Sequence, residues 1–177
     1  MPLAYRYWSL KEDKLISPFR TKYIWTPRAN WAKCLPPYEP LPADITIWDG
    51  YEDDFTPVLC RNSSPNKDCK QEFGCGLYAN LDPETVVHNM VDVAVNPPKI
   101  MGLVYGWGHV LYHGDGIVRC EIMDIWAMCA IPKYFSNSFL GDFAYWAIKG
   151  NIPFYVATSK AEAVQWLKGM SIKLLER

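Results

Sequence analysis

The stretches IMGLVYGWGHVLY (Ile100–Tyr112) and IVRCEIMDIWAMCA (Ile117–Ala130) decide the fold of this chain. Both are rich in β-branched and aromatic residues, a composition typical of strands. They are separated by His113–Gly116, which contains Asp-Gly, the strongest short-range signal for a hairpin when it lies between two β-rich runs. We therefore expect a long central β-hairpin.

The hairpin predicts which residues face one another. If Asp115 and Gly116 form a two-residue turn, Tyr112 pairs with Arg119 and Val110 pairs with Glu121. Arg119 and Glu121 then lie close enough to Tyr112 for a charge-assisted network. Alternation assigns Trp107, His109, Leu111, His113, Val118, Cys120, Ile122 and Trp126 to one face and Val110, Tyr112, Arg119, Glu121, Met123 and Ile125 to the other.

Before the central hairpin the chain predicts strands and loops. Tyr5–Leu10 and Leu15–Ser17 flank the polar Lys11–Lys14, which predicts a β-hairpin with a four-residue loop. Ile45–Trp48 is predicted as a further strand. The polar, turn-rich segment from residue 51 to residue 69 is predicted as a long loop.

Three helices are predicted from their capping signals. Asp82-Pro83-Glu84 begins a helix that we expect to run to about Val93. A second helix over Ser138–Lys149 ends at Gly150, and a strand over Pro153–Ala157 follows it. Ser159–Glu162 is a capping box that begins the third helix, which Gly169 is expected to end.

The order of these elements predicts an α+β domain. Its sheet is expected to be curved and mostly antiparallel, or a half-barrel, with about three helices packed on one side. The 177 residues fit a single domain. A proline-rich half of strands and loops covers about residues 1–80, and a half containing the hairpin and the helices covers about residues 81–177.

Charge and hydropathy exclude several classes of partner. The chain has 18 Lys and Arg against 19 Asp and Glu, so it lacks the basic excess needed to coat nucleic acid. No stretch reaches the ~18 apolar residues of a membrane span, and the first ten residues lack the pattern of a signal peptide. We therefore expect a cytoplasmic protein with no membrane partner.

The six cysteines are expected to be reduced thiols, and no metal or cofactor is predicted. Cys60, Cys69 and Cys75 are separated by eight and five residues, whereas structural zinc sites usually pair ligands two to four residues apart. A distant fourth ligand such as Cys34, His88 or His113 leaves the alternative of a metal site open.

Function is predicted from the aromatic content, because the chain is aromatic-rich, with 8 Trp, 11 Tyr and 7 Phe. We expect a non-enzymatic recognition module that binds a small ligand, a modified base or a partner protein. Trp146 and Trp166, on predicted helices, are expected to fill the core. The tryptophans in strands and loops, which are free to bind a ligand, are Trp8, Trp25, Trp31, Trp48 and Trp107. The predicted ligand-binding residues are Trp107, Tyr112, His113, Arg119 and Glu121.

Two other functions stay open. One is a small hydrolase or nuclease that uses His113 as a base, assisted by Glu121 or Cys75. No nucleophile elbow accompanies these residues, so an enzyme is the less favoured reading. The other is a protein inhibitor that acts through an exposed apolar patch.

A resemblance to a known family rests on two motifs. One motif is Cys75–Ala79, and the other is a later run comprising Trp107-Gly108, Val110, His113, Gly116, Arg119 and Glu121. Both resemble motifs of a family of small uncharacterised proteins from actinobacteria and their phages. The resemblance extends along most of the chain and implies a shared architecture and a phage association, but no activity. Cys69 lies farther from Cys75 than is usual in the family, and Cys120 stands where Ala is usual, which argues against a shared metal or disulfide role.

Overall fold

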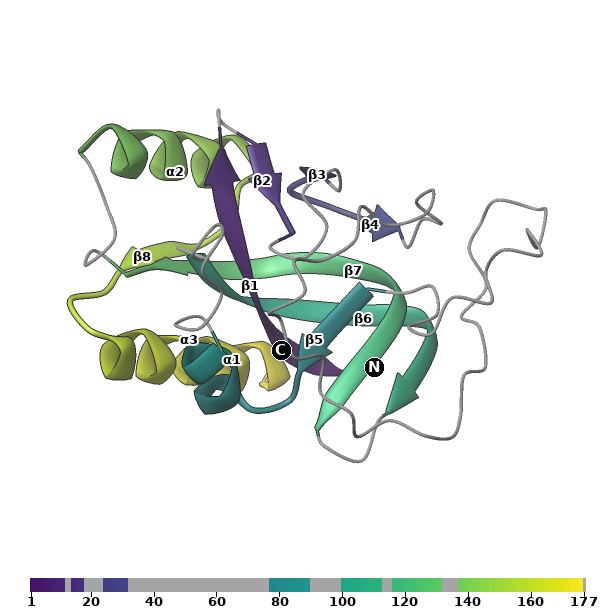
Figure 1. Ribbon diagram of the computed structural model, residues 1–177. Coiled ribbons are helices and arrows are strands. Elements are labelled where there is room, and N and C mark those ends of the chain that lie inside the picture. The colour runs from purple at the N-terminus through teal and green to yellow at the C-terminus, as the bar shows by residue number, and fades with distance from the viewer. Residues whose placement is uncertain are drawn as a thin grey trace, which may run out of the picture.

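The computed structural model describes residues 1–11, 14–17, 24–31, 77–89, 100–112, 116–131 and 137–176. The elements, in chain order, are β1 (Leu3–Lys11), β2 (Lys14–Ile16), β3 (Ile24–Trp25), β4 (Asn30–Trp31), β5 (Leu77–Asn80), α1 (Pro83–Asn89), β6 (Ile100–Tyr112), β7 (Ile117–Ala130), α2 (Asn137–Lys149), β8 (Phe154–Val156) and α3 (Lys160–Leu175) (Figure 1). The predicted strand over Ile45–Trp48 and the predicted loop over residues 51–69 lie outside these ranges.

The central hairpin is confirmed, since β6 and β7 have the predicted bounds and pair antiparallel along their length. β1 pairs with β5 and β6, which both pair with β7, so these four strands close on themselves. β2, β3 and β4 extend the antiparallel sheet, while β8 joins β7 in parallel. The expected α+β fold with a curved, mostly antiparallel sheet is therefore confirmed.

The register of the hairpin differs from the prediction. Tyr112 pairs with Val118, and Val110 pairs with Cys120, one residue away from the pairing that a two-residue turn would impose. Arg119 consequently pairs with Leu111 rather than Tyr112. The predicted pairs of Tyr112 with Arg119 and of Val110 with Glu121 are wrong.

The first hairpin is also tighter than predicted. Lys11 pairs with Lys14 and Leu10 pairs with Leu15, so the ladder includes residues that the prediction placed in a four-residue loop. Only residues 12 and 13 separate the two strands. The charged lysines had indicated a loop, but an exposed side chain such as that of Lys14 does not prevent its backbone from pairing.

Two core clusters lie on opposite faces of β1, because its successive side chains alternate. Ala4 and Trp8 belong to one cluster, which Phe139 and Phe143 of α2 complete. Tyr5 belongs to the other, which contains residues of α1 and α3. In Figure 1 α2 lies on one side of the sheet and α1 and α3 on the other, so the prediction of helices on one side is wrong in that respect. Separation into two helical layers buries both faces of β1.

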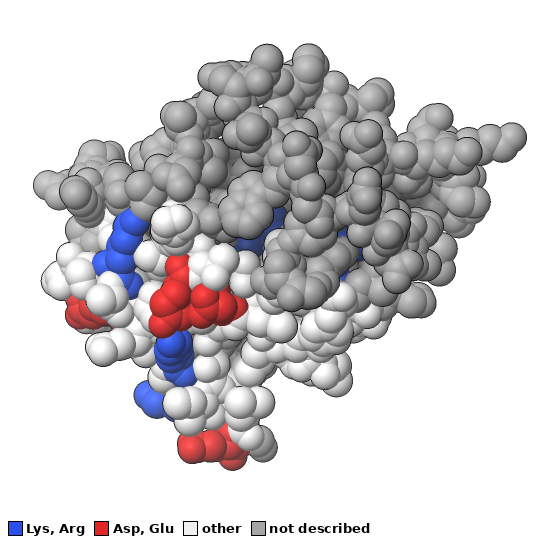
Figure 2. Space-filling view, turned by 60° about the horizontal axis from the view of Figure 1, so that its bottom comes forward, with Lys and Arg blue, Asp and Glu red and all other residues white. Residues whose placement is uncertain are grey.

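The surface formed by α1 and α3 carries both signs of charge. Lys168 Nζ of α3 donates a hydrogen bond to Glu84 Oε1 of α1 at 2.6 Å, and Figure 2 shows acidic and basic side chains next to each other on this face. In the part of the chain that the structure describes, none of the helices combines the length and the apolar character that a membrane span requires.

The helix starts are confirmed, and the predicted end of the third helix differs. Asp82 Oδ2 accepts a hydrogen bond from Thr85 N at 2.9 Å, as an N-cap should. The described part of α1 ends at Asn89, and the predicted end near Val93 lies outside the described residues. α3 continues through Gly169 to Leu175. Nothing lies within 4 Å of where a Cβ on Gly169 would be, so no tertiary contact forces a turn there.

The first turn of α3 is held by the carboxylate of Glu162. Ser159 Oγ accepts a hydrogen bond from Glu162 N at 3.2 Å, which confirms the N-cap. The Glu162 carboxylate accepts from Thr158 N and Thr158 Oγ1, and also from the Tyr155 hydroxyl. These hydrogen bonds, that of the Thr158 side chain first, lower the pKa of Glu162 from 4.5 to about 2.

We expect Glu162 to make stability pH-dependent. Because its folded-state pKa lies below its ordinary value, its contribution is complete above about pH 4.5 and is lost as pH falls toward 2. Glu162→Gln should lower the melting temperature at pH 7, and the difference from wild type should shrink on acidification and vanish near pH 2. Circular dichroism melts across this range measure it.

Glu176→Gln is the matched control for this effect, because Glu176 is an exposed glutamate at the other end of the same helix. It should melt in parallel with wild type over the whole range. A difference between Glu162→Gln and wild type that stays constant with pH would contradict the assignment.

Candidate functional site

A glycine bulge in β6 shapes the end of the sheet farthest from the helices. Trp107 pairs with Ile122 and Val110 pairs with Cys120, so Gly108 and residue 109 lie opposite the single residue Glu121. Gly108 has φ +77°, the left-handed conformation that the first residue of a G1 bulge requires. A Cβ at Gly108 would also lie 2.6 Å from Glu121 Oε2.

The bulge changes which residues share a face. Cys120 and Met123 belong to the same core cluster although an odd number of positions separates them, so the strict alternation predicted for β7 fails between them. Ile122, next to Met123, therefore points to the opposite face, as does its cross-strand partner Trp107. Arg119, next to Cys120, points to that face too. The prediction that separated Trp107 from Arg119 is wrong.

Two tryptophans flank Ile122 on this face. Trp31 of β4 and Trp107 of β6 are both cross-strand partners of Ile122. Their ring centroids lie 5.9 Å apart with an interplanar angle of 63°, an edge-to-face contact. Both side chains are only half-buried. We call Trp31, Tyr78, Trp107, Arg119 and Ile122 the tryptophan face.

The other strand tryptophans have a different role. Trp8 and Trp25 are 0% and 1% exposed and pack edge to face, with ring centroids 5.3 Å apart. They are core residues, so the prediction that they were free to bind a ligand is wrong. Trp146 packs against the core cluster that contains Trp8 and Trp25, which confirms its predicted core role. Trp48 lies outside the described residues.

Arg119 is enclosed within the tryptophan face rather than presented on it. Its side chain is 0% exposed, and Nη1 donates a hydrogen bond to the Tyr78 hydroxyl at 3.3 Å. Tyr78 is its cross-strand partner in β5. No sequence signal predicts this contact, because the two residues are 41 positions apart and only the register of β5 on β7 joins them. Arg119 therefore acts as a buried support for the surface residues.

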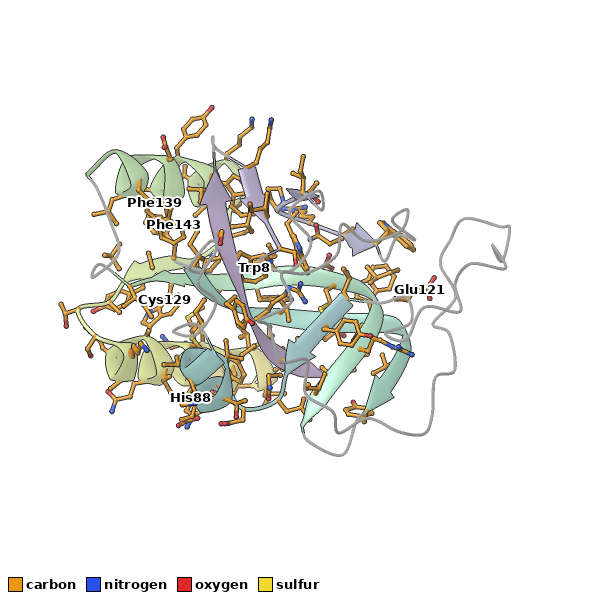
Figure 3. All side chains as sticks on the ribbon, viewed as in Figure 1. Trp8, His88, Glu121, Cys129, Phe139 and Phe143 are labelled. Atoms are coloured by element: carbon orange, nitrogen blue, oxygen red, sulfur yellow. The ribbon has the colours of Figure 1, made fainter. Side chains whose placement is uncertain are left out.

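The remaining predicted site residues are dispersed or undescribed. Glu121 is half-buried and lies at the end of the sheet away from the helices (Figure 3). Tyr112 is 63% exposed and, as the partner of Val118, lies on the opposite face from Arg119, so the predicted network with Arg119 is wrong. His113 and Cys75 lie outside the described residues.

The two described cysteines do not supply a nucleophile. Cys120 and Cys129 are buried, and desolvation raises the pKa of each thiol to about 12, so both are protonated at neutral pH. Among the residues that the structure describes, no three His, Cys, Asp or Glu side chains gather into a possible metal site. Cys60 and Cys69 are outside those residues, so the alternative of a distant zinc ligand stays a prediction.

Comparisons of the chain with protein-family models, curated proteins and solved structures find no match. The geometry of the tryptophan face is therefore the basis for inferring function.

Removing the glycine bulge should disturb the tryptophan face. We expect Gly108→Ala to cost about 1–3 kcal/mol of unfolding free energy, because alanine is strained at positive φ and its Cβ would meet Glu121. Gly141→Ala, in α2 with no neighbour within 4 Å of the added Cβ, should instead add about 0.5–1 kcal/mol. Urea denaturation measures both; equal effects would contradict the bulge assignment.

Proposed function

We propose that the protein is a non-enzymatic recognition module that binds a ring-shaped group on the tryptophan face. One observation carries this proposal: Trp31 and Trp107 stay half-buried on a sheet face, while Trp8 and Trp25 in the same sheet are almost completely buried. Tryptophans used only to fill the core would be buried like the second pair. The exposed part of the two indoles is the surface that we propose to contact a partner.

The chemistry of the face favours a ring that also forms hydrogen bonds. Indole rings stack on nucleobases, sugars and aromatic side chains, and stacking is worth ~1–3 kcal/mol per base in single-strand binders. The carboxylate of the half-buried Glu121, opposite the bulge that follows Trp107, can accept hydrogen bonds from such a ring. The Arg119 guanidinium, which donates a hydrogen bond to the Tyr78 hydroxyl, lies buried beneath this surface. A small ligand, a modified base or an aromatic side chain of a partner protein meets these requirements.

The two alternative functions have less support. A hydrolase or nuclease would depend on His113 and Cys75, which lie outside the described residues, so Glu121 is its sole described candidate. An inhibitor would need one continuous apolar patch. The large exposed apolar side chains on the described helices lie on elements that cover opposite faces of the sheet: Tyr145 and Ile148 on α2, and Ile172 and Leu175 on α3.

The proposal predicts that loss of either indole abolishes binding. Saturation-transfer NMR with nucleosides, monosaccharides and short tryptophan- or tyrosine-containing peptides should identify a class that binds wild type. Trp107→Ala and Trp31→Ala should weaken that binding by about tenfold, the equivalent of one stacking contact. Affinity capture with wild type and Trp107→Ala tests a partner protein in the same way.

Trp126→Ala is the matched control, because Trp126 is also a surface tryptophan of β7, at 38% exposure, but lies outside the tryptophan face. It should bind like wild type. Equal binding by Trp107→Ala, Trp31→Ala and wild type would overturn the proposal, as would the failure of all these probes and of affinity capture.

A further inference from the structure

An open hollow of about 360 Å³ lies on another part of the surface, between the β3–β4 turn and the C-terminal end of α2. Its lining residues are Thr26, Pro27, Arg28, Lys149, Gly150 and Asn151. The volume is near the lower end of the range for small-molecule sites, about 300–1,000 Å³. The two sides of the hollow come from segments more than 100 positions apart, so only the tertiary structure creates it.

The β3–β4 turn holds its side of the hollow rigidly. The Asn30 side chain accepts a hydrogen bond from Thr26 N at 2.7 Å and donates to Thr26 O at 3.0 Å. Ala29 N donates to Asp124 Oδ1 of β7, and Ala29 has φ +38°, an uncommon conformation for a residue other than glycine. Arg28 is thus mounted on a turn that three hydrogen bonds and a strained neighbour fix in place.

The end of α2 holds the other side. Ile152 N donates to Ala147 O and Asn151 N donates to Ile148 O, both at 2.9 Å, and Asn151 has φ +52°. This is a Schellman motif with Asn151 as its left-handed residue, one position later than the predicted end at Gly150. Gly150 instead packs on Pro27, where a Cβ would approach Pro27 Cβ to 2.6 Å. This contact fixes the spacing between the two sides.

Two basic residues, Arg28 and Lys149, belong to the lining of this hollow. Arg28 and Lys149 are exposed, and neither forms an ion pair with any residue that the structure describes. No acidic side chain belongs to the lining. Lys149 Nζ lies 6.0 Å from the centroid of the Tyr145 ring, the outer limit of a cation–π contact, so it can turn inward at little cost.

The local backbone opposes an anion less than a helix end with open carbonyls would. The last carbonyls of a helix carry partial negative charge, which repels anions. Here the carbonyls of Trp146, Ala147 and Ile148 all accept hydrogen bonds from the chain that follows, which reduces that repulsion. The packing therefore places two basic residues around one hollow, where an anion would be attracted by both.

We propose that this hollow is a binding site for a phosphoryl group, either free phosphate or the phosphate of a small molecule. The planar guanidinium of Arg28 suits two oxygens of a phosphate, and the ammonium of Lys149 adds a point charge. The side-chain amide of Asn151, also exposed, supplies a further donor. This site is independent of the tryptophan face and does not depend on the function proposed for it.

Calorimetric titration of the full chain with inorganic phosphate and with adenosine monophosphate tests the proposal. Saturable binding is expected for at least one, and Arg28→Ala or Lys149→Ala should each weaken it by about tenfold or more. Lys149→Arg should retain it within a few-fold. Lys173→Ala, which removes an exposed lysine from the last turn of α3, and Trp107→Ala should both bind like wild type.

The two ligands separate the possible sources of the phosphoryl group. Binding of both at similar affinity indicates free phosphate, whereas tighter binding of the monophosphate, lost in Arg28→Ala, indicates a phosphorylated small molecule. Adenosine monophosphate binding that survives both alanine substitutions but not Trp107→Ala would assign it to the tryptophan face. That result, or an effect of phosphate no greater than that of chloride at the same ionic strength, would overturn the proposal.

Discussion

Backbone pairing along β7 is the constraint on which the rest of the structure depends. This strand forms hydrogen-bonded ladders with β4, β5, β6 and β8, so every part of the sheet is placed relative to it. Glycines in its partner β6 permit close packing across the sheet. A Cβ at Gly102 would lie 2.6 Å from both the Ala127 carbonyl oxygen and Trp8 Cζ3, so the Trp8 ring packs directly on the backbone.

The glycine bulge at the other end of β6 links this pairing to the proposed recognition surface. Because Gly108 accommodates the extra residue, Trp107 comes to lie beside Trp31, with Ile122 between them. The buried Arg119 below this surface adds a positive charge whose desolvation must be offset by its contacts. Burying a charged Arg119 side chain stabilises the fold less than burying an apolar side chain of similar size would. Its presence is consistent with a role beyond folding.

The short strand β4 connects the two proposed binding sites. Asn30 closes the turn that carries Arg28, and its side chain also donates a hydrogen bond to the Met123 carbonyl of β7 at 3.3 Å. The next residue, Trp31, belongs to the tryptophan face. Side chains of adjacent strand residues point to opposite faces. Asn30 therefore supports the hollow lined by basic residues, whereas Trp31 belongs to the tryptophan face. Both surfaces are held by the same pairing of β4 with β7.

The sequence by itself determined the local elements: the bounds of β6 and β7, the starts of the three helices and the α+β class, because strand propensity and capping act within a few residues. Register, the face of Trp107 and the burial of Arg119 were decided only by the tertiary structure. One extra residue in a strand moves every later side chain of that strand to the other face of the sheet. The contact between Arg119 and Tyr78 joins residues that are 41 positions apart in the sequence. The proposed phosphoryl site is the extreme case, because Arg28 and Lys149 line one hollow only through the packing of Gly150 on Pro27.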